Sequence, residues 1–282
     1  MDFLSFIPGI ICIIVAFIIM IRLMHYAKFY APSYFFWIGI ILAFIGIVSL
    51  AYPLRFLFVL NRAVAAYTLF GGLLISAISL LSPVKKRSSS TSNQKIDDLM
   101  PVYAFNEIHE VEINASPEKA KQVLQTTGVK DIPAARLLMK IRGIADDDLD
   151  MIDRAANNIA GSETISTPDF NFFVISPDEW ITVMILKSVI ITNNSHQPKP
   201  PEIKSLEQFV AFNEPGYIKV TVNFRFISNG NGKTLLTTET RNCGIMPKDN
   251  RIFGYYWRII YPGSAIIRRV WLDTIKKRTE HC

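Results

Sequence analysis

Three long runs of apolar residues fill the first part of the chain, at residues 3–21, 34–50 and 63–81. Each run is about as long as an α-helix must be to cross a hydrocarbon core of roughly 30 Å. A secretory signal peptide would open with a basic residue, whereas Asp2 stands near the start of this sequence. We therefore expect residues 1–84 to form a membrane region with three transmembrane helices.

The second apolar run carries two further membrane features. Aromatic residues gather at its start, at positions 34–37, as side chains of a membrane interface do. Gly39, Ala43 and Gly46 fall on one helical face, where small residues let a neighbouring helix approach closely. We expect the helices to pack as a compact bundle.

A different pattern begins after residues 85–100, a polar stretch rich in serine and basic residues that has the composition of a flexible linker. We expect one folded domain over residues 101–282. Apolar residues at every second position predict strands at 103–113, 171–175, 180–191, 206–212, 217–227 and 233–243. Helices are predicted after Pro117, after Pro133 and over the acid-rich residues 145–161.

The chain ends in an amphipathic stretch at residues 264–280, and the Pro-Gly-Ser sequence before it predicts the start of a helix. Ile267 and Trp271 belong to its apolar stripe. A curved antiparallel sheet around this helix would bury the apolar surfaces of both. The predicted fold class is therefore α+β, with N-terminal transmembrane helices followed by a sheet that wraps a long C-terminal helix.

The facing of two charged residues depends on the hairpin formed by the Ser-Asn-Gly-Asn-Gly sequence. A two-residue turn pairs Phe224 with Glu239. It also pairs Val222 with Arg241, and the charged pair then points inward, where it could anchor a polar ligand head. A five-residue loop pairs Val222 with Thr238 and turns the charges outward. The sequence leaves both registers open.

Three segments carry a resemblance to a known family: TTETR at Thr237–Arg241, FGYYWRIIYPGS at Phe253–Ser264, and the terminal IIRRVWLDTIKKRTE. Together with the order of elements, they make residues 100–280 resemble the START-like helix-grip (SRPBCC) superfamily. The closest likeness is to bacterial members of unknown function with N-terminal membrane helices. Members typically hold a hydrophobic ligand between the sheet and the terminal helix, and some are cyclases or hydrolases. TTETR matches no catalytic signature, so the resemblance implies no particular reaction.

The resemblance implies a membrane-anchored domain that binds a lipid or another hydrophobic small molecule, with lipid transfer as one form of this function. A cyclase-like or hydrolase-like enzyme in the same cavity is the alternative, so enzymatic activity stays undecided, and a scaffold with a closed core is a third reading. We expect Ile267 and Trp271 to face Val222 and Phe224 across an apolar space. The predicted ligand-binding residues are Val222, Phe224, Thr238, Glu239, Thr240, Arg241, Tyr256, Trp257, Ile267 and Trp271.

Other chemistry finds little support in the sequence. The formal charge of +6 is shared equally by the two parts of the chain, so no basic stripe for nucleic acid is expected. The cysteines lack metal-ligand spacing, and no metal site or cofactor is predicted. His109, with Glu107 and Glu110 nearby, could form an acid/base pair, but we prefer a surface-exposed strand face as its explanation. The sequence identifies no protein partner.

The basic residues at the span ends predict the orientation. Five of them, Arg22, Lys28, Lys85, Lys86 and Arg87, follow the first and third spans, whereas two lie in the other loop. We therefore expect an integral membrane protein, of the bacterial inner membrane by resemblance, with the N-terminus outside and the C-terminal domain in the cytoplasm. The lipid bilayer and a hydrophobic small molecule are its expected partners.

Overall fold

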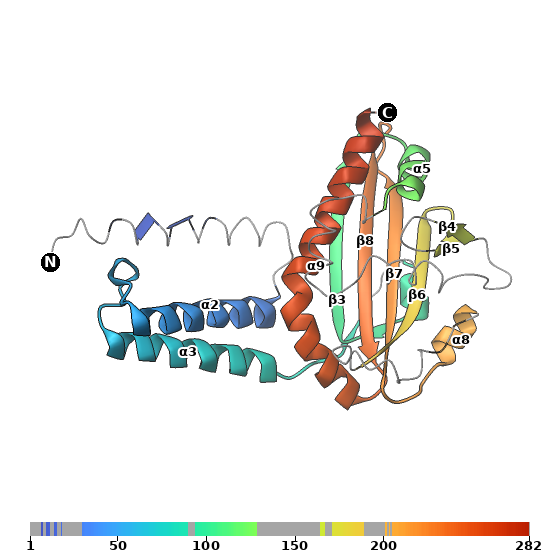
Figure 1. Cartoon of the computed structure of the whole chain (residues 1–282). Coiled ribbons are helices and arrows are strands. Elements are labelled where there is room, and N and C mark those ends of the chain that lie inside the picture. Colours follow the sequence, from blue (N-terminus) through green and yellow to red (C-terminus); the bar gives the residue numbers. More distant parts are fainter. Residues whose placement is uncertain are drawn as a thin grey trace. The chain divides into compact units, whose positions relative to one another are not determined.

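The computed structural model describes residues 30–89, 94–128, 164–166, 171–188 and 205–281, with single positions among residues 7–18 and at 201 and 203 (Figure 1). The chain divides into two compact units, which we describe separately. The hairpin unit comprises Met1–Pro83 and Gly254–Pro262, and the sheet unit comprises Val84–Phe253 and Gly263–Cys282. Most of the first predicted span, and both helices predicted between residues 133 and 161, lie outside the described residues.

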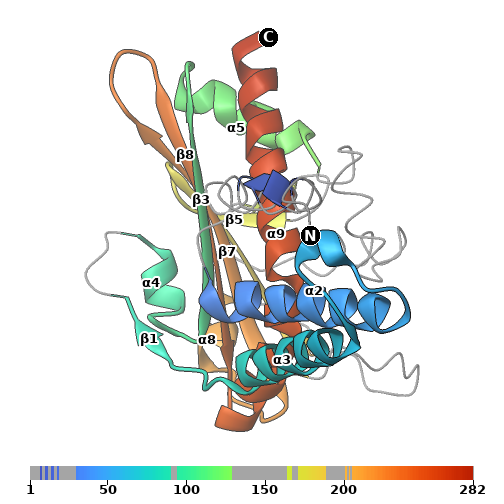
Figure 2. The same ribbon diagram turned by 90° about the vertical axis from the view of Figure 1, so that its left-hand side faces the viewer.

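Two apolar helices, α2 (Ala31–Ala51) and α3 (Arg62–Leu81), lie side by side in the hairpin unit (Figure 2). The short 3₁₀-helix η2 (Arg55–Leu57) lies in the connection between them. Asn61 starts α3, because its side chain accepts a hydrogen bond of 3.0 Å from the N–H of Val64. The second and third predicted spans are therefore helices, and both are long and apolar enough to cross a bilayer.

Small residues set the distance between α2 and α3. Gly39 and Gly72 lie so close to the facing helix that a Cβ atom on either would collide with its backbone. Ser76 of α3 donates its hydroxyl to a main-chain carbonyl of α2 at 3.1 Å. The predicted packing face of α2, with Ala43 and Gly46, is confirmed, since these residues are buried against α3.

In the described part of the sheet unit, six antiparallel strands form the main sheet, in the order β3-β8-β7-β6-β5-β4. Their bounds are β3 (Phe105–Ile113), β4 (Thr164–Ser166), β5 (Asn171–Ser176), β6 (Glu179–Lys187), β7 (Tyr217–Ser228) and β8 (Thr234–Gly244). A two-stranded sheet pairs β1 (Arg87–Ser88) with β2 (Val102–Tyr103). Five of the six predicted strands are thus present.

One face of the sheet packs against the C-terminal part of α9 (Pro247–His281) (Figure 1). The helix α5 (Pro117–Thr126), whose first turn is capped by Ser116, joins the same core. This arrangement of an antiparallel sheet and a long terminal helix is compatible with a helix grip. The core contains Val111, Ile113, Ala120, Leu124, Trp180, Phe224, Phe226, Leu236, Ile267, Trp271, Leu272 and Ile275.

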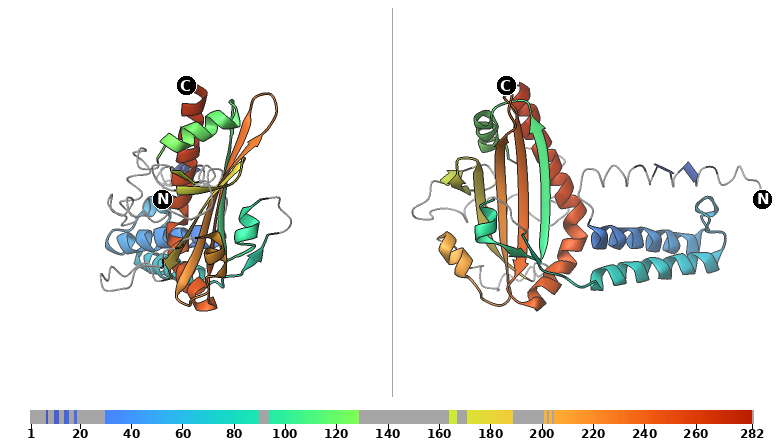
Figure 3. Two further views of the ribbon diagram at one scale, coloured as in Figure 1. Left: turned by 90° about the vertical axis from the view of Figure 1, so that its right-hand side faces the viewer. Right: turned by 180° about the vertical axis from the view of Figure 1, so that it is seen from behind.

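The opposite face of the sheet is also buried, beneath α4 (Ile96–Leu99) and α8 (Leu206–Ala211) (Figures 2 and 3). Residues 94–100, predicted to belong to a polar linker, contribute two buried side chains, Ile96 and Met100. This second core also contains Phe173, Ile181, Val183, Ile185 and Phe209.

The prediction of a strand at residues 206–212 is wrong, because this segment forms α8. Ser205 accepts a hydrogen bond of 3.1 Å from the N–H of Gln208, as a helix N-cap does. Leu206, Phe209 and Val210 also have the i, i+3, i+4 spacing of a helix, although only Phe209 is fully buried. The apolar run alone does not distinguish a short helix from a strand, and the Ser205 cap favours the helix.

The terminal helix is longer than predicted, since α9 begins at Pro247 and not at Ser264. Asp249 stabilises this start by accepting a hydrogen bond of 2.9 Å from the N–H of Met246. Pro262, expected to precede the helix, lies inside it. Phe253 through Tyr261 are therefore helical and do not form a loop before the helix.

Hydrogen bonds from α2 compensate for the proline in α9. Pro262 has no N–H for the carbonyl four residues earlier, which belongs to Arg258. Ser33 supplies the missing bond, with its Oγ 2.5 Å from that carbonyl oxygen. Trp37 donates its Nε1–H to the next carbonyl, that of Ile259, at 3.0 Å. Residues 254–262 thereby form one unit with the hairpin.

Cationic side chains of α9 bind the outer edge of the sheet. β3 is the end strand among the described residues, and its partner there is β8. Arg269 donates from Nη1 to the carbonyl oxygen of Glu110 at 2.9 Å, and Lys276 donates from Nζ to that of Glu112 at 2.7 Å. Two main-chain carbonyl groups along this edge, two residues apart, thus already accept hydrogen bonds from α9.

Candidate functional site

The ten residues predicted to bind ligand lie in three separate places. Six face each other between the sheet and α9: Val222, Phe224, Thr238, Thr240, Ile267 and Trp271. Glu239 and Arg241 lie on the opposite face of the sheet. Tyr256 and Trp257 belong to the part of α9 that groups with the hairpin unit. The sheet therefore separates the first two groups, which do not form one site.

The observed β7–β8 register separates the charged pair from the helix. Phe224 pairs with Thr238 and Val222 with Thr240, around a loop of five residues, 229–233. Neither predicted register is correct in its pairs. The facing is that of the five-residue alternative, because the observed register is shifted from it by two residues, whereas it is shifted from the two-residue alternative by one. Glu239 and Arg241 therefore point away from α9.

A buried polar cluster lies between the sheet and α9, and we call it the inner polar cluster. Its strand residues are Glu107, His109, Thr238, Thr240 and Asn242, and its helix residues are Ser264 and Arg268. His109 Nε2 lies 2.8 Å from one carboxylate oxygen of Glu107, and Ser264 donates to the other at 2.9 Å. Arg268 Nη1 lies 3.1 Å from the hydroxyl of Thr238.

The preferred explanation of His109, an exposed strand face, is wrong. His109 is 5% exposed and Glu107 is 2% exposed, because both share the inward face of β3 with Val111 and Ile113. Glu110 lies on the other face and does not join the pair. The period-2 pattern that identified the apolar face of this strand could also have located the pair.

Two polar atoms of the inner polar cluster lack partners among the described residues. They are the hydroxyl of Thr240 and the side-chain nitrogen of Asn242, and both residues are less than 10% exposed. Thr240 is the cross-strand neighbour of Glu107. Buried polar groups nearly always have a hydrogen-bond partner, from the protein, from water or from a ligand. This part of the face therefore has unused capacity to bind a polar group.

The aromatic part of the same face is closed. The rings of Phe224 and Trp271 are 5.0 Å apart in edge-to-face contact, so no apolar space separates these two residues. The indole N–H of Trp271 donates to the carbonyl oxygen of Thr127 at 2.9 Å. An apolar ligand would therefore have to lie beside this contact and closer to the inner polar cluster.

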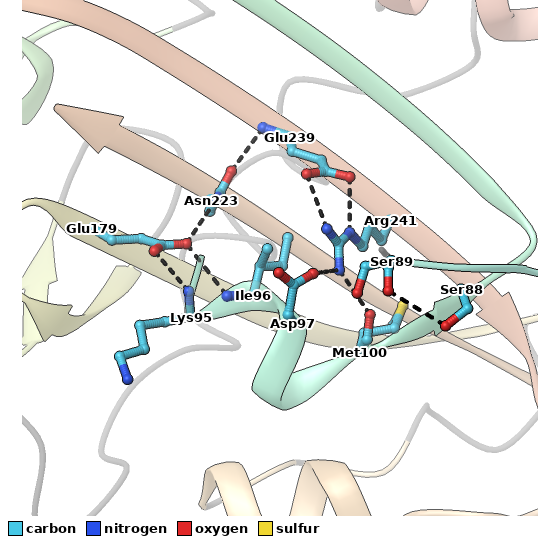
Figure 4. A network of polar contacts seen from close by, with 10 residues as sticks. All are labelled: Ser88, Ser89, Lys95, Ile96, Asp97, Met100, Glu179, Asn223, Glu239 and Arg241. Atoms are coloured by element: carbon cyan, nitrogen blue, oxygen red, sulfur yellow. Dashed lines mark hydrogen bonds and ion pairs between the residues drawn. The ribbon is translucent and has the colours of Figure 1, made fainter. Parts of the chain in front are cut away.

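The opposite face carries a second network, centred on Arg241 (Figure 4). Its guanidinium binds both carboxylate oxygens of Glu239, at 2.8 and 3.2 Å, and Asp97 at 2.6 Å. It also donates to the carbonyl of Met100 at 2.9 Å and stacks 4.8 Å from the ring centre of Tyr103. Burial lowers the pKa of Arg241, but the two carboxylates outweigh it and raise the pKa above its usual value.

A second carboxylate extends this network to the start of α4. Glu179 accepts hydrogen bonds from the main-chain N–H groups of Lys95 at 2.9 Å and Ile96 at 3.3 Å. Asn223 donates to Glu179 at 2.7 Å and accepts from the N–H of Glu239 at 2.8 Å (Figure 4). The network therefore fastens residues 95–100 to the sheet, and its groups bind one another.

Sequence reasoning missed Asp97 and Glu179 as members of this network. Glu179 lies on the same face of β6 as Ile181 and Val183, which could have indicated that it is buried. Asp97 gave no such signal, because it lies 144 residues from Arg241 in the sequence. Within the described residues, no group of three or more metal-ligating side chains could hold a metal ion.

Comparison with known proteins adds no assignment. No protein-family model matches the sequence, and no curated protein or solved structure gives a match.

Proposed function

We propose that this protein is a membrane-anchored binding protein for a lipid or another apolar small molecule with a polar end. The ligand would lie between the sheet and α9, with its polar end at the inner polar cluster. The main support is the pair of buried groups on Thr240 and Asn242 that have no partner among the described residues. Together they offer a hydroxyl and an amide donor, which suit a carbonyl, carboxylate or phosphate oxygen.

The membrane anchor in this proposal consists of α2 and α3, with the apolar run at residues 3–21 as a third span. The basic residues Lys85, Lys86 and Arg87 follow α3 and are exposed, as cytoplasmic flanking residues are. The sheet unit would then be cytoplasmic, and the membrane that of a bacterial cell. A reporter enzyme fused after Cys282 should show the activity expected of a cytoplasmic fusion. A signal from the outer side would contradict this orientation.

An enzyme of the cyclase or hydrolase kind is the second candidate, because of the buried pair of Glu107 and His109. A histidine oriented by a carboxylate at 2.8 Å can act as a general base. However, Ser264 binds the same carboxylate and is not bound to the histidine, so the three residues do not form a nucleophile-base-acid relay. Binding without reaction is therefore the leading proposal.

The proposal can be tested with the full-length protein in mild detergent. Small molecules that remain bound would be released and identified by mass spectrometry. Thr240→Val and Asn242→Leu should each reduce the retained ligand about three- to tenfold, as expected for one lost hydrogen bond. Thr237→Val is the matched control, because Thr237 lies on the same strand and faces away from α9. Retention equal to that of the control, or no retained molecule, would contradict the proposal.

The enzyme alternative needs a separate measurement. His109→Gln keeps a hydrogen-bonding side chain but removes the base. If the protein converts its bound molecule, this variant should accumulate the unconverted molecule at normal occupancy. The same chemical species in both proteins would favour binding alone.

A further inference from the structure

Arg258 is a buried cation whose charge has no counter-ion among the described residues. Arg258 is only 1% exposed. Nη1 donates to the carbonyl oxygen of Leu80 at 2.8 Å, and Nη2 donates to that of Ser82 at 2.6 Å. These bonds satisfy two of its five N–H donors, and Nε has no described partner. These carbonyls lie at the C-terminal end of α3, whose negative dipole end offsets part of the charge, but no described carboxylate pairs with it.

The hairpin unit has almost no acidic residue that could supply the counter-ion. Residues 1–83 contain a single acid, Asp2, and residues 254–262 contain none. The same unit carries the exposed cations Arg55 and Arg62 at the turn between its helices. Since buried charges in proteins are normally paired, an anion from outside the chain is the expected partner of Arg258.

An apolar groove reaches the same place. It has a volume of about 360 Å³ and is lined by Ala31, Pro32, Phe35, Ile75, Ile78, Ser79 and Ser82. It therefore lies between the first turns of α2 and the last turns of α3. Phe35 and Ile78 on its rim are more than half exposed, so the groove opens on the outer surface of the helix pair. Ser82 links the groove to Arg258, because it lines the first and binds the second.

We propose that this groove binds one acyl chain of an anionic phospholipid, whose phosphate is the counter-ion of Arg258. A phosphate oxygen can accept from the remaining N–H donors of a guanidinium in fork geometry. The apolar lining suits a hydrocarbon chain. The excess of positive over negative side chains in this unit favours an anionic headgroup over a zwitterionic one. The inference rests on the hairpin lying in a bilayer, and it is independent of the ligand proposed for the sheet unit.

Lipid composition provides the first test. The full-length protein would be delipidated and reconstituted into vesicles of equal phosphatidylglycerol and phosphatidylcholine. It would then be extracted in mild detergent, and bound lipids counted by native mass spectrometry. Phosphatidylglycerol should exceed phosphatidylcholine about tenfold among retained lipids, as for a charge-assisted contact. Retention of both lipids in the vesicle ratio would overturn the proposal.

Variants separate the roles of the charge and the groove. Arg258→Gln should abolish the preference for phosphatidylglycerol, whereas Arg62→Gln, which removes an exposed arginine of the same unit, should keep it. Ala31→Phe should fill the groove and reduce retention of both lipids. Ala77→Phe is its control, because Ala77 is an exposed residue of α3 that does not line the groove. An unchanged preference in Arg258→Gln would refute the role of its charge.

Two further outcomes decide between occupants. If Arg258→Gln fails to fold, Ala31→Phe still decides, because it leaves Arg258 in place. Displacement of phosphatidylglycerol by millimolar inorganic phosphate would show a site for the free anion and would overturn the lipid assignment. Normal lipid retention by Ala31→Phe would also overturn it, since the groove would then hold no acyl chain.

Discussion

Arg241 shows how a single residue can be charged and almost fully buried. Its partners are Glu239, two residues earlier on β8, and groups in residues 97–103, so two carboxylates and a carbonyl replace the water that the guanidinium loses. Such a pair gains little over an apolar core of equal volume, but it is costly to break. Its effect is to fix where residues 95–100 lie on the sheet.

Arg241→Met should therefore destabilise the protein strongly. The substitution leaves Glu239 and Asp97 buried without a cation, and the free energy of unfolding should fall by about 3–5 kcal/mol. Denaturant titration of the full-length protein in detergent, followed by tryptophan fluorescence, would measure this. Arg225→Met is the control, since Arg225 lies 4.0 Å from a half-exposed Asp178, and its loss should cost under about 1 kcal/mol. Similar losses in both variants would contradict the assigned role.

Cys243 gives a prediction about pH. Burial raises the pKa of its thiol, and the nearby Lys86 and Lys219 offset this only in part. With Cys12 and Cys282 replaced by serine, alkylation of the folded protein at pH 8 to 9 should be slower than in the same protein unfolded in denaturant. Because the folded state disfavours the thiolate, stability should fall as the pH rises above about 8.5, the ordinary thiol value. Equal alkylation rates would show an accessible, ordinary thiol.

At the residue scale, the face of a strand on which an apolar residue lies could be predicted from the sequence. Whether that face is covered by other parts of the chain could not. The alternation of β3 and β7 correctly placed Val111, Ile113, Val222 and Phe224 on one face. The sequence left the facing of Arg241 open between two hairpin registers, and the observed register turns it to the other face. That face is buried by segments distant in the sequence, and no local pattern reports such a cover.

At the element scale, the proline in α9 makes a prediction that couples two helices. Ser33→Ala removes the donor to the carbonyl of Arg258 and should cost about 1–3 kcal/mol, the penalty of an unpaired buried acceptor. Pro262→Ala restores an N–H four residues after that carbonyl. In the Pro262→Ala background, Ser33→Ala should therefore cost less than in the native protein.

Thermal unfolding of the four proteins of this double-mutant cycle would measure the coupling. Ser88→Ala, which changes an exposed serine of β1, should leave the midpoint unchanged. Strictly additive effects of Ser33→Ala and Pro262→Ala would show that the hydroxyl does not replace the missing N–H.

The elements that sequence reasoning misplaced share one cause. α9 was predicted to start after Pro262 because an isolated helix tolerates proline only in its first turn. The compensating donors come from Ser33 and Trp37, more than 200 residues away. α8 was misread for the opposite reason, since its signal is a single N-cap serine beside a short apolar run. Regular strands with long alternation were predicted well.

For the whole molecule, the two compact units predict the result of truncation. The sequence predicts one folded domain over residues 101–282, but residues 254–262 take hydrogen-bond partners from α2 and from residues 80–82. Removal of residues 1–83 should therefore expose Trp257 and Tyr261, which are now buried. We expect the shortened protein to require detergent and to lose amide protection over residues 254–262.

Hydrogen–deuterium exchange with mass spectrometry would measure this protection. The strands β3, β7 and β8 should stay protected, because their partners all lie in the sheet unit. A detergent-free monomer with full protection at residues 254–262 would show that the hairpin is dispensable for this part of α9.

The cations of α9 at the edge of β3 have a consequence for solubility. An end strand with free carbonyl and N–H groups is a template on which a second chain can add a strand and seed aggregates. Here Arg269 and Lys276 already occupy the carbonyls of Glu110 and Glu112, and they place positive charge along that edge. The helix itself thus hinders intermolecular strand addition at β3, which favours a sheet unit that stays dispersed at high protein concentration.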